Sequence, residues 1–230
     1  MITPSTVMEG YHRIVFIFIL FTLFAVGSSS HNGQIAGAPA SSHSKTTTLG
    51  AVPFTEHDIT TTAVGARQVF SIDVDGDGDI DMLSASMNDD TIAWYENDGN
   101  QIFTKHDITT SADGAHSVFA IDVDGDGDID VLSASYTDDT VAWFENDGNQ
   151  VFAEHPISTS ADAAYYVIAI DLDGDGDIDV LSASFNDNTV AWYENDGSQG
   201  FTKHDITTLH YGVLFAIDVD GDGDIDVLMA

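Results

Sequence analysis

The sequence predicts an all-β protein built from four-stranded repeats, and two patterns support this prediction. Equivalent residues recur at a fixed step: Asp73, Asp122 and Asp171 are 49 positions apart, and Asp218 follows after 47. Within each repeat, four short runs rich in Val, Ile, Phe, Trp and Thr alternate with turn signals, which is typical of strands. No segment of helical length has an apolar period of about 3.6 residues. Four antiparallel strands repeated about every 40–50 residues are typical of β-propeller blades.

The first full repeat contains the four predicted strands, which are VFSIDV (69–74), DMLSAS (81–86), TIAWYEN (91–97) and IFTKHDIT (102–109). The last two are joined through Asp98-Gly99, a strong hairpin signal because Gly accepts positive φ. Three repeats are complete, a fourth stops after two strands, and a single strand, FTEHDITT (54–61), precedes them. We therefore predict an incomplete arc of about 3.5 repeats. A closed four-bladed propeller is the alternative.

Composition narrows the classes of function. The chain has 230 residues and is 43% hydrophobic, which suffices for a sizeable core. It carries 39 acidic residues against 5 Lys and Arg, for a net charge of −34, and this excludes nucleic-acid binding because phosphate contacts need basic side chains. The absence of cysteine excludes disulfides, thiolate zinc sites and cysteine nucleophiles.

The N-terminal region predicts export. An apolar run of 13 residues, 14–26, follows Arg13, which suits a signal-peptide core and is short for a membrane span of about 20 residues. We expect a signal peptide or signal anchor over 1–27, a flexible linker over 28–50, and the repeats over 51–230. The protein is then secreted or at the cell surface, and it meets a membrane only if the N-terminal anchor is left uncleaved.

The most unusual motif is DVDGDGDID at 73–81, which recurs at 122–130, at 218–226 and, as DLDGDGDID, at 171–179. Five carboxylates this close repel one another unless a cation lies among them. The motif matches the start of an EF-hand loop, in which positions 1, 3 and 5 offer side chains and position 7 a backbone carbonyl to Ca²⁺. Here position 9 would close the site. We predict about four Ca²⁺ ions, one per loop, held by Asp73, Asp75, Asp77, Asp79, Asp81, Asp122, Asp124, Asp126, Asp128, Asp130, Asp171, Asp173, Asp175, Asp177, Asp179, Asp218, Asp220, Asp222, Asp224 and Asp226.

These residues resemble the FG-GAP family of integrin-alpha-type repeats and its bacterial VCBS relatives. In VFSIDVDGDGDIDMLSAS (69–86) and its copies, the aspartate loop matches the family pattern, whereas V-[FI]-[AS] and S-A-S replace the literal FG and GAP tripeptides. The resemblance covers about residues 54–230. It implies a propeller, usually of seven blades, with calcium in the hairpin loops on one face, and adhesion or ligand binding more often than catalysis.

Positions that vary between the copies are the better candidates for ligand contacts. Arg67, His116 and Tyr165 are equivalent residues before the first strand of a repeat, and Met87, Tyr136 and Phe185 are equivalent residues after the second. In an up-and-down sheet, both sets lie at the end opposite the aspartate loops, where they could contact a protein or glycan.

Two further series are the same in every copy and are predicted to be structural. Trp94, Trp143 and Trp192 are expected between blades. The histidines are expected to make cross-strand contacts rather than to bind zinc, and they are His57, His106, His155 and His204.

The functional prediction is an exported calcium-binding module for adhesion or for recognition of an extracellular protein or glycan. The alternative is a propeller domain of, or accessory to, a secreted polysaccharide-degrading enzyme. Catalysis needs a unique group of acid, base and charge stabiliser in one place, and near-identical copies do not offer one. We therefore predict that the chain is not an enzyme.

Overall fold

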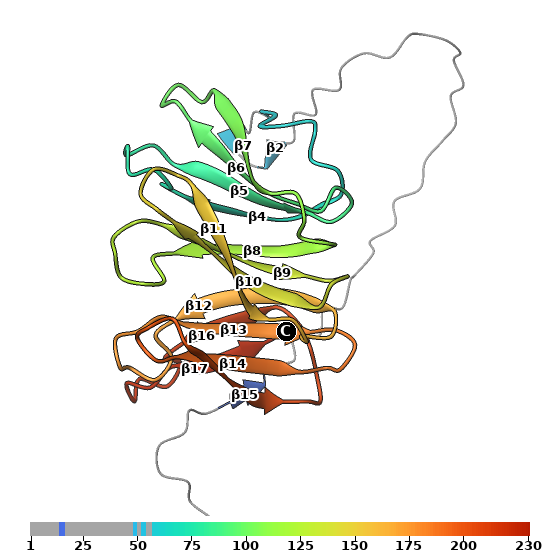
Figure 1. Cartoon of the computed structure of the whole chain (residues 1–230), viewed down its shortest axis with the longest axis vertical. Coiled ribbons are helices and arrows are strands. Elements are labelled where there is room, and N and C mark those ends of the chain that lie inside the picture. Colours follow the sequence, from blue (N-terminus) through green and yellow to red (C-terminus); the bar gives the residue numbers. More distant parts are fainter. Residues whose placement is uncertain (1–13, 17–47, 50–51, 54–56) are drawn as a thin grey trace, which may run out of the picture.

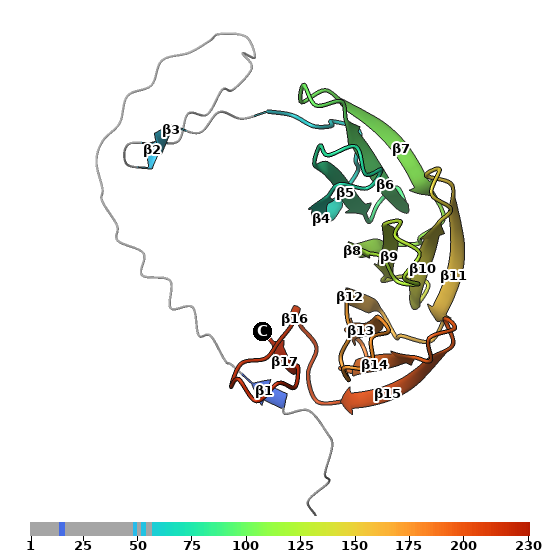
Figure 2. The same cartoon turned by 90° about the vertical axis from the view of Figure 1, so that its left-hand side faces the viewer.

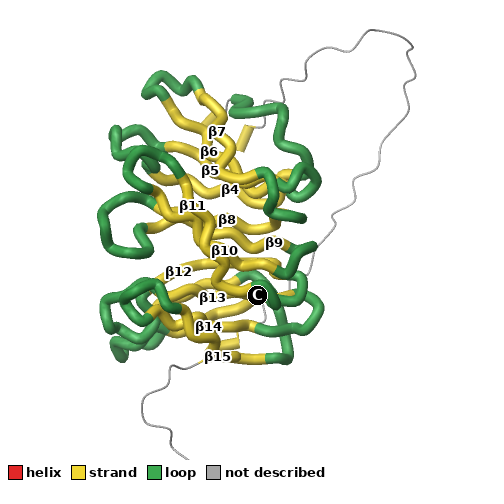
Figure 3. Tube along the Cα trace, in the orientation of Figure 1, coloured by secondary structure: helices red, strands yellow, loops and turns green. Residues whose placement is uncertain are grey.

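The computed structural model describes residues 14–16, 48–49, 52–53 and 57–230, and this part consists of strands and loops (Figures 1 and 3). Three sheets of four antiparallel strands and a partial fourth follow one another around an open arc (Figure 2). The prediction of an all-β, incomplete propeller is thus confirmed, and the arc does not close into a four-bladed ring. Within these residues no helix has the length and apolarity needed to cross a membrane.

Each of the three complete sheets, called blades 1 to 3, consists of four consecutive strands. Blade 1 contains β4 (Ala66–Ile72), β5 (Asp81–Ser86), β6 (Thr91–Asn97) and β7 (Phe103–Thr109). Blade 2 contains β8 (Ala115–Ile121), β9 (Asp130–Ser135), β10 (Thr140–Asn146) and β11 (Phe152–Ser158). Blade 3 contains β12 (Ala164–Ile170), β13 (Asp179–Ser184), β14 (Val190–Asn195) and β15 (Phe201–Thr207).

The partial blade contains β16 (Leu214–Ile217) and β17 (Asp226–Met229), which pair antiparallel. The short strand β1 (Ile14–Phe16) pairs in parallel with β17. Two further short strands, β2 (Thr48–Leu49) and β3 (Val52–Pro53), pair with each other. The predicted signal segment and linker otherwise lie outside the described residues and stay predictions.

The strand order fixes two ends for every blade. The innermost strands along the arc are β4, β8, β12 and β16, and β7, β11 and β15 lie outermost (Figure 2). In blade 1, Ile72 pairs with Asp81 at one end and Ala66 pairs with Ser86 at the other. The aspartate loops and the β6–β7 type of hairpin therefore share one end, the metal-loop end, while the β5–β6 type of hairpin lies at the opposite end.

The core lies between neighbouring blades. Phe70, Leu83 and Trp94 of blade 1 pack against Val131 and Phe144 of blade 2, and equivalent side chains form the next two interfaces. Trp94 and Trp143 are buried within these interfaces, and the partly buried Trp192 packs in the third, so the predicted position of this series is confirmed. Blades 2 and 3 thus each bury one face against the preceding blade and the other against the next.

The strand predicted over 54–61 is wrong for residues 57–61, which are the part of it that the structure describes. Residues 57–61, the second half of the strand predicted over 54–61, form no strand. Its equivalent in the next repeat, β7, pairs with the Trp-bearing strand β6, and the sequence has no tryptophan before Trp94. Because a strand needs a neighbour for its backbone hydrogen bonds, His57 has no cross-strand partner of the kind found in later repeats.

Candidate functional site

Each aspartate loop is curled by hydrogen bonds from its own backbone. In the first loop, the two carboxylate oxygens of Asp73 accept from the N–H groups of Gly76 and Gly78, at 2.8 and 2.9 Å. Gly78 has φ of 97°, a conformation that a side chain at this position would strain. The other three loops repeat this pattern. The two glycines of the motif therefore let the chain wrap around the carboxylate at position 1.

The aspartate at position 9 is buried and ties three strands together. Asp81 is 1% exposed. Its Oδ2 accepts from the N–H of Val74, after β4, at 3.1 Å, and its Oδ1 accepts from the N–H of Asn97, at the end of β6, at 2.8 Å. Asp130 and Asp179 make the same two bonds in blades 2 and 3. An ionised carboxylate offers about four lone-pair positions, so these bonds leave about two for a cation.

Three carboxylates come together in every loop. Asp73, Asp75 and Asp81 each place one oxygen within 4.8 Å of the other two. Positions 1, 3 and 9 of the remaining loops form the same groups: Asp122, Asp124 and Asp130; Asp171, Asp173 and Asp179; Asp218, Asp220 and Asp226. Ligands at 2.3–2.6 Å from one Ca²⁺ lie at most about 5 Å apart, so each group fits a single ion of this size. All donors are hard oxygens, which suit Ca²⁺ or Mg²⁺ rather than softer metals.

Burial of these carboxylates disfavours their ionised form unless a positive charge lies close to them. Burial raises the pKa of Asp130 to about 6, against the lowering effect of the N–H groups of Asn146 and Val123 and of the nearby Trp143 indole. Burial also raises the pKa of Asp124 at position 3, and the charges of Asp126, Asp122 and Glu145 raise it further. The Lys side chains that form ion pairs in the described part of the chain, Lys105 and Lys203, pair with strand residues instead. A divalent cation would offset this cost by stabilising the ionised carboxylates.

Positions 5 and 7 are placed differently from the other three. The Oδ1 of Asp77 accepts from the N–H of Asp79 at 2.8 Å, and Asp77 is not part of the group of three. The side chain of Asp79 lies against Gly99 of the β6–β7 hairpin, so closely that a Cβ on Gly99 would come within 2.5 Å of its Oδ2. Asp128 and Asp177 lie in the same way against Gly148 and Gly197. The prediction that all five aspartates hold the ion stays a prediction; the structure groups three of them.

The six predicted ligand-contact residues lie at the opposite end of the blades, and four of them gather in one place. The ring of His116 lies 4.1 Å from that of Tyr165 and 6.2 Å from that of Tyr136, and Tyr136 lies 5.8 Å from Phe185. Tyr211, before β16, extends the group at 4.5 Å from Phe185. We call these five rings the aromatic cluster. It spans blade 2, blade 3 and the start of the partial blade, and its rings are half-buried or exposed.

The remaining two predicted residues form a pair of their own in blade 1. The guanidinium of Arg67 donates to the Sδ of Met87, with Nη2 at 3.0 Å and Nε at 3.2 Å. Burial lowers the pKa of the His116 imidazole, and the nearby charge of Arg67 adds to this lowering. Tyr211 was missed by sequence comparison because two residues are lost between His204 and Asp218, which shifts it out of alignment with Tyr165.

His116 is held in place by a backbone contact between blades. Its Nδ1 lies 2.8 Å from the carbonyl oxygen of Tyr165 and donates to it. Burial against the neighbouring rings lowers the pKa of His116 below its usual range, and the bond to Tyr165 opposes this. The neutral imidazole is therefore favoured, and it presents a ring face within the aromatic cluster.

Three of the four repeated histidines make cross-strand contacts, as predicted, whereas His57 lies in no strand. His106 pairs in register with Trp94, with ring centres 4.6 Å apart, and its Nε2 lies 2.8 Å from Glu96 Oε2. Blades 2 and 3 repeat this arrangement with His155 and His204. Each histidine stays within its own blade, so the series forms no shared metal site among the described residues.

Comparison with known families agrees with this architecture. The family model of the FG-GAP-like repeat matches residues 73–133, 122–182 and 171–229. The chain belongs to the FG-GAP-like repeat family. Each match begins at position 1 of an aspartate loop and runs into the following blade, so the family unit includes the interface between two blades. Comparison with curated proteins finds no match.

Proposed function

We propose that this FG-GAP-like protein is an exported recognition module, with blades braced by Ca²⁺ at one end and an extracellular protein or glycan bound at the other. The observation that carries this proposal is the separation of two groups of residues. The repeated aspartates lie at the metal-loop end, and the residues that differ between copies meet at the opposite end in the aromatic cluster.

The metal loops would serve the scaffold. When bound, Ca²⁺ would neutralise the three grouped carboxylates of each loop. Asp81 and its equivalents already link the ends of β4-type and β6-type strands through their N–H groups. Keeping these carboxylates ionised and in place therefore holds three strands of a blade in register, which is a structural role.

The aromatic cluster has the composition of a recognition surface. Tyrosine and phenylalanine supply large contact areas with few rotatable bonds, and histidine adds a polar ring. Polar groups also lie next to the rings. Asn186 follows Phe185 in the chain, and its Nδ2 donates to Asp162 Oδ1 at 2.8 Å. Such a surface can place apolar rings against a ligand and hydrogen-bond donors and acceptors around it.

Binding to panels of immobilised glycans and extracellular proteins tests this proposal. Phe185→Ser and Tyr211→Ser remove two exposed rings of the cluster. Val151→Ser is the matched control, since Val151 is also exposed but lies in a hairpin at the metal-loop end. We expect at least one panel member to bind the unmodified chain and the control equally, and either cluster variant about tenfold more weakly.

Two results would count against recognition by this face. One is the absence of binding to every panel member in millimolar calcium. The other is binding that Phe185→Ser and Tyr211→Ser leave unchanged. Cleavage of a bound polysaccharide would instead favour the enzymatic alternative.

A further inference from the structure

The two ends of the arc expose apolar side chains whose equivalents are covered at every interface inside the chain. Blade 1 presents the face that blades 2 and 3 bury against their predecessors, and the partial blade presents the face that blades 1 to 3 bury against their successors. We call these surfaces the leading face and the trailing face. Large exposed apolar patches on repeat proteins mark an interface or need a polar cap.

The leading face is formed by β4 and β5. Val69 is 59% exposed, whereas its equivalents Val118 and Val167 are fully buried, at 0%. Ile80, just before β5, is likewise exposed, although its equivalents pack against the hydrophobic clusters in all three internal interfaces. The side chains that normally receive a preceding blade are thus open to solvent here.

The trailing face is formed by β16 and the residue that follows its metal-loop aspartate. Phe215, Ile217 and Val219 alternate along the chain and therefore point to the same side. Phe215 is 61% exposed and Val219 is 49% exposed. The equivalents of Val219, which are Val74, Val123 and Leu172, are all at most 3% exposed because the next blade covers them.

We propose that the occupant of these faces is a second copy of this chain, joined head to tail, with the trailing face of one copy on the leading face of the next. The complementarity is already present inside the molecule, because the chain makes the same interface between blades 1 and 2 and again between blades 2 and 3. There, Phe70 of blade 1 meets Phe119 of blade 2 with ring centres 4.8 Å apart. By repeat position, Phe215 of the partial blade is equivalent to Phe70, and Phe70 of blade 1 is equivalent to Phe119, so a head-to-tail contact would bring Phe215 of one copy and Phe70 of the next together in the same way.

Such a contact is heterologous, because two different surfaces meet. It closes into a ring if the rotation between copies allows and otherwise grows into a filament. The net charge of −34 opposes association of identical chains. At physiological ionic strength, salt screens the repulsion between exposed charges more than about 8 Å apart, so association is expected to strengthen from low to physiological salt.

The test uses the full 230-residue chain and sedimentation velocity in physiological salt with millimolar calcium, over a wide range of protein concentration. Val69→Asp disables the leading face and Phe215→Asp the trailing face. Val151→Asp is the control, an exposed valine on neither face. Both targets are on the surface, and near-ultraviolet circular dichroism verifies that the variants fold. Val69→Thr provides a second leading-face variant that keeps the branched shape.

We expect the unmodified chain and the control to reach at least twice the 24.6 kDa of one chain, and each face variant to stay monomeric. An equimolar mixture of Val69→Asp and Phe215→Asp can form one intact contact. In it, the trailing face of the Val69→Asp chain meets the leading face of the Phe215→Asp chain. That mixture should form dimers and nothing larger. A monomeric unmodified chain, face variants that associate as before, or a mixture that stays monomeric would each overturn the proposal.

Discussion

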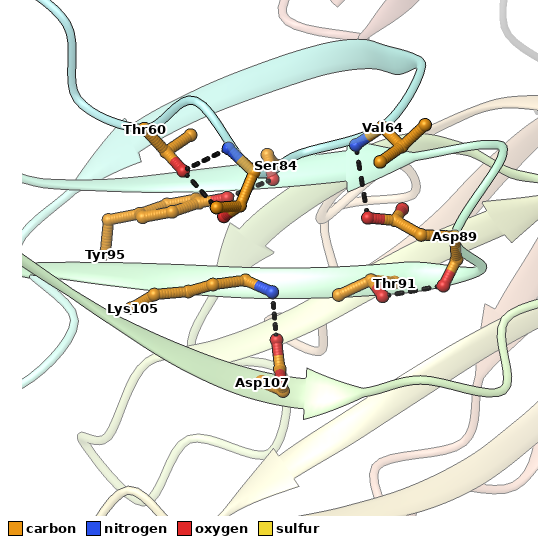
Figure 4. Close-up of polar contacts among 9 residues, drawn as sticks. Thr60, Val64, Ser84, Asp89, Thr91, Tyr95, Lys105 and Asp107 are labelled. Carbon is orange, nitrogen blue, oxygen red and sulfur yellow. Dashed lines mark hydrogen bonds and ion pairs between the residues drawn. The ribbon is translucent and has the colours of Figure 1, made fainter.

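Replacing Phe144 by Tyr should stabilise the protein, because blade 2 lacks a hydrogen bond that blades 1 and 3 make. In blade 1 the hydroxyls of Ser84 and Tyr95 lie 3.3 Å apart (Figure 4), and in blade 3 Ser182 donates to the hydroxyl of Tyr193 at 3.4 Å. Blade 2 has Phe144 at the tyrosine position, and the hydroxyl of Ser133 is buried without a partner. Phe144→Tyr places a phenol oxygen where the other two blades already accommodate one.

The structure sets the size of this effect. A hydrogen bond of this kind contributes about 0.5–1.5 kcal/mol, and distances of 3.3–3.4 Å favour the lower half of that range. We therefore expect the free energy of unfolding to rise by about 0.5–1 kcal/mol, which corresponds to about 1–4 °C in Tm for a chain of this size. Urea and thermal unfolding at fixed calcium concentration measure both quantities.

A double-mutant cycle identifies the cause. Ser133→Ala removes the unpaired hydroxyl, and in that background Phe144→Tyr should give no gain, because the new phenol then has no partner. The reasoning is refuted if Phe144→Tyr leaves stability unchanged or lowers it. It is also refuted if the gain persists without the serine.

Two other predictions concern the metal loops and the opposite end. Asp124→Ala removes one of three grouped carboxylates, so native mass spectrometry should count three bound calcium ions in place of four. The control Asp98→Ala, which changes an exposed hairpin at the same end, should keep four. Equal ion counts in the two variants would contradict the geometry. His116 should titrate with a pKa below 6.5 by NMR, assigned by the signal lost in His116→Gln. Because the pKa of His116 is lowered in the folded state, the contribution of His116 to stability is complete above pH 6.5 and declines as the pH falls toward that lowered pKa. His116→Gln should therefore flatten the dependence of stability on pH in this window. A raised pKa would show that burial does not dominate.

Much of the blade could be predicted from sequence because alternation and turn chemistry are local. The predicted bounds of β5 and β6 agree with the structure, since each begins at an Asp or Thr after a turn and ends at a Ser or Asn. β4 begins at Ala66, three residues before its predicted start, because Ala66 and the polar Gln68 still pair with β5, with Arg67 at an irregularity of the register between them. Apolar patterning cannot reveal a polar residue such as Gln68 that pairs within a strand and accepts hydrogen bonds from the next blade.

The site was predictable in its place but not in its detail. The repeat spacing predicts where the aspartate loops lie, and the up-and-down order places Tyr136, Tyr165 and Phe185 at the other end. The grouping of positions 1, 3 and 9 depends on how Asp81 is fixed by the N–H groups of Val74, which follows β4, and Asn97, which ends β6. Likewise Asp79 is turned toward Gly99, a contact between two hairpins. Such contacts follow from the folded sheet and carry no signal in the loop sequence itself.

The central claim is that divalent cations hold the grouped carboxylates and brace the blades. Thermal unfolding of the intact chain, compared between millimolar calcium and excess EDTA with the bound ions counted in parallel, tests it most directly. Sites with the affinity of extracellular calcium modules, about 10⁻⁴–10⁻³ M, each add about 0.5–1.5 kcal/mol at millimolar calcium, so we expect four ions and a Tm that rises with calcium concentration. A melting temperature indifferent to chelation, with no ion bound, would contradict it.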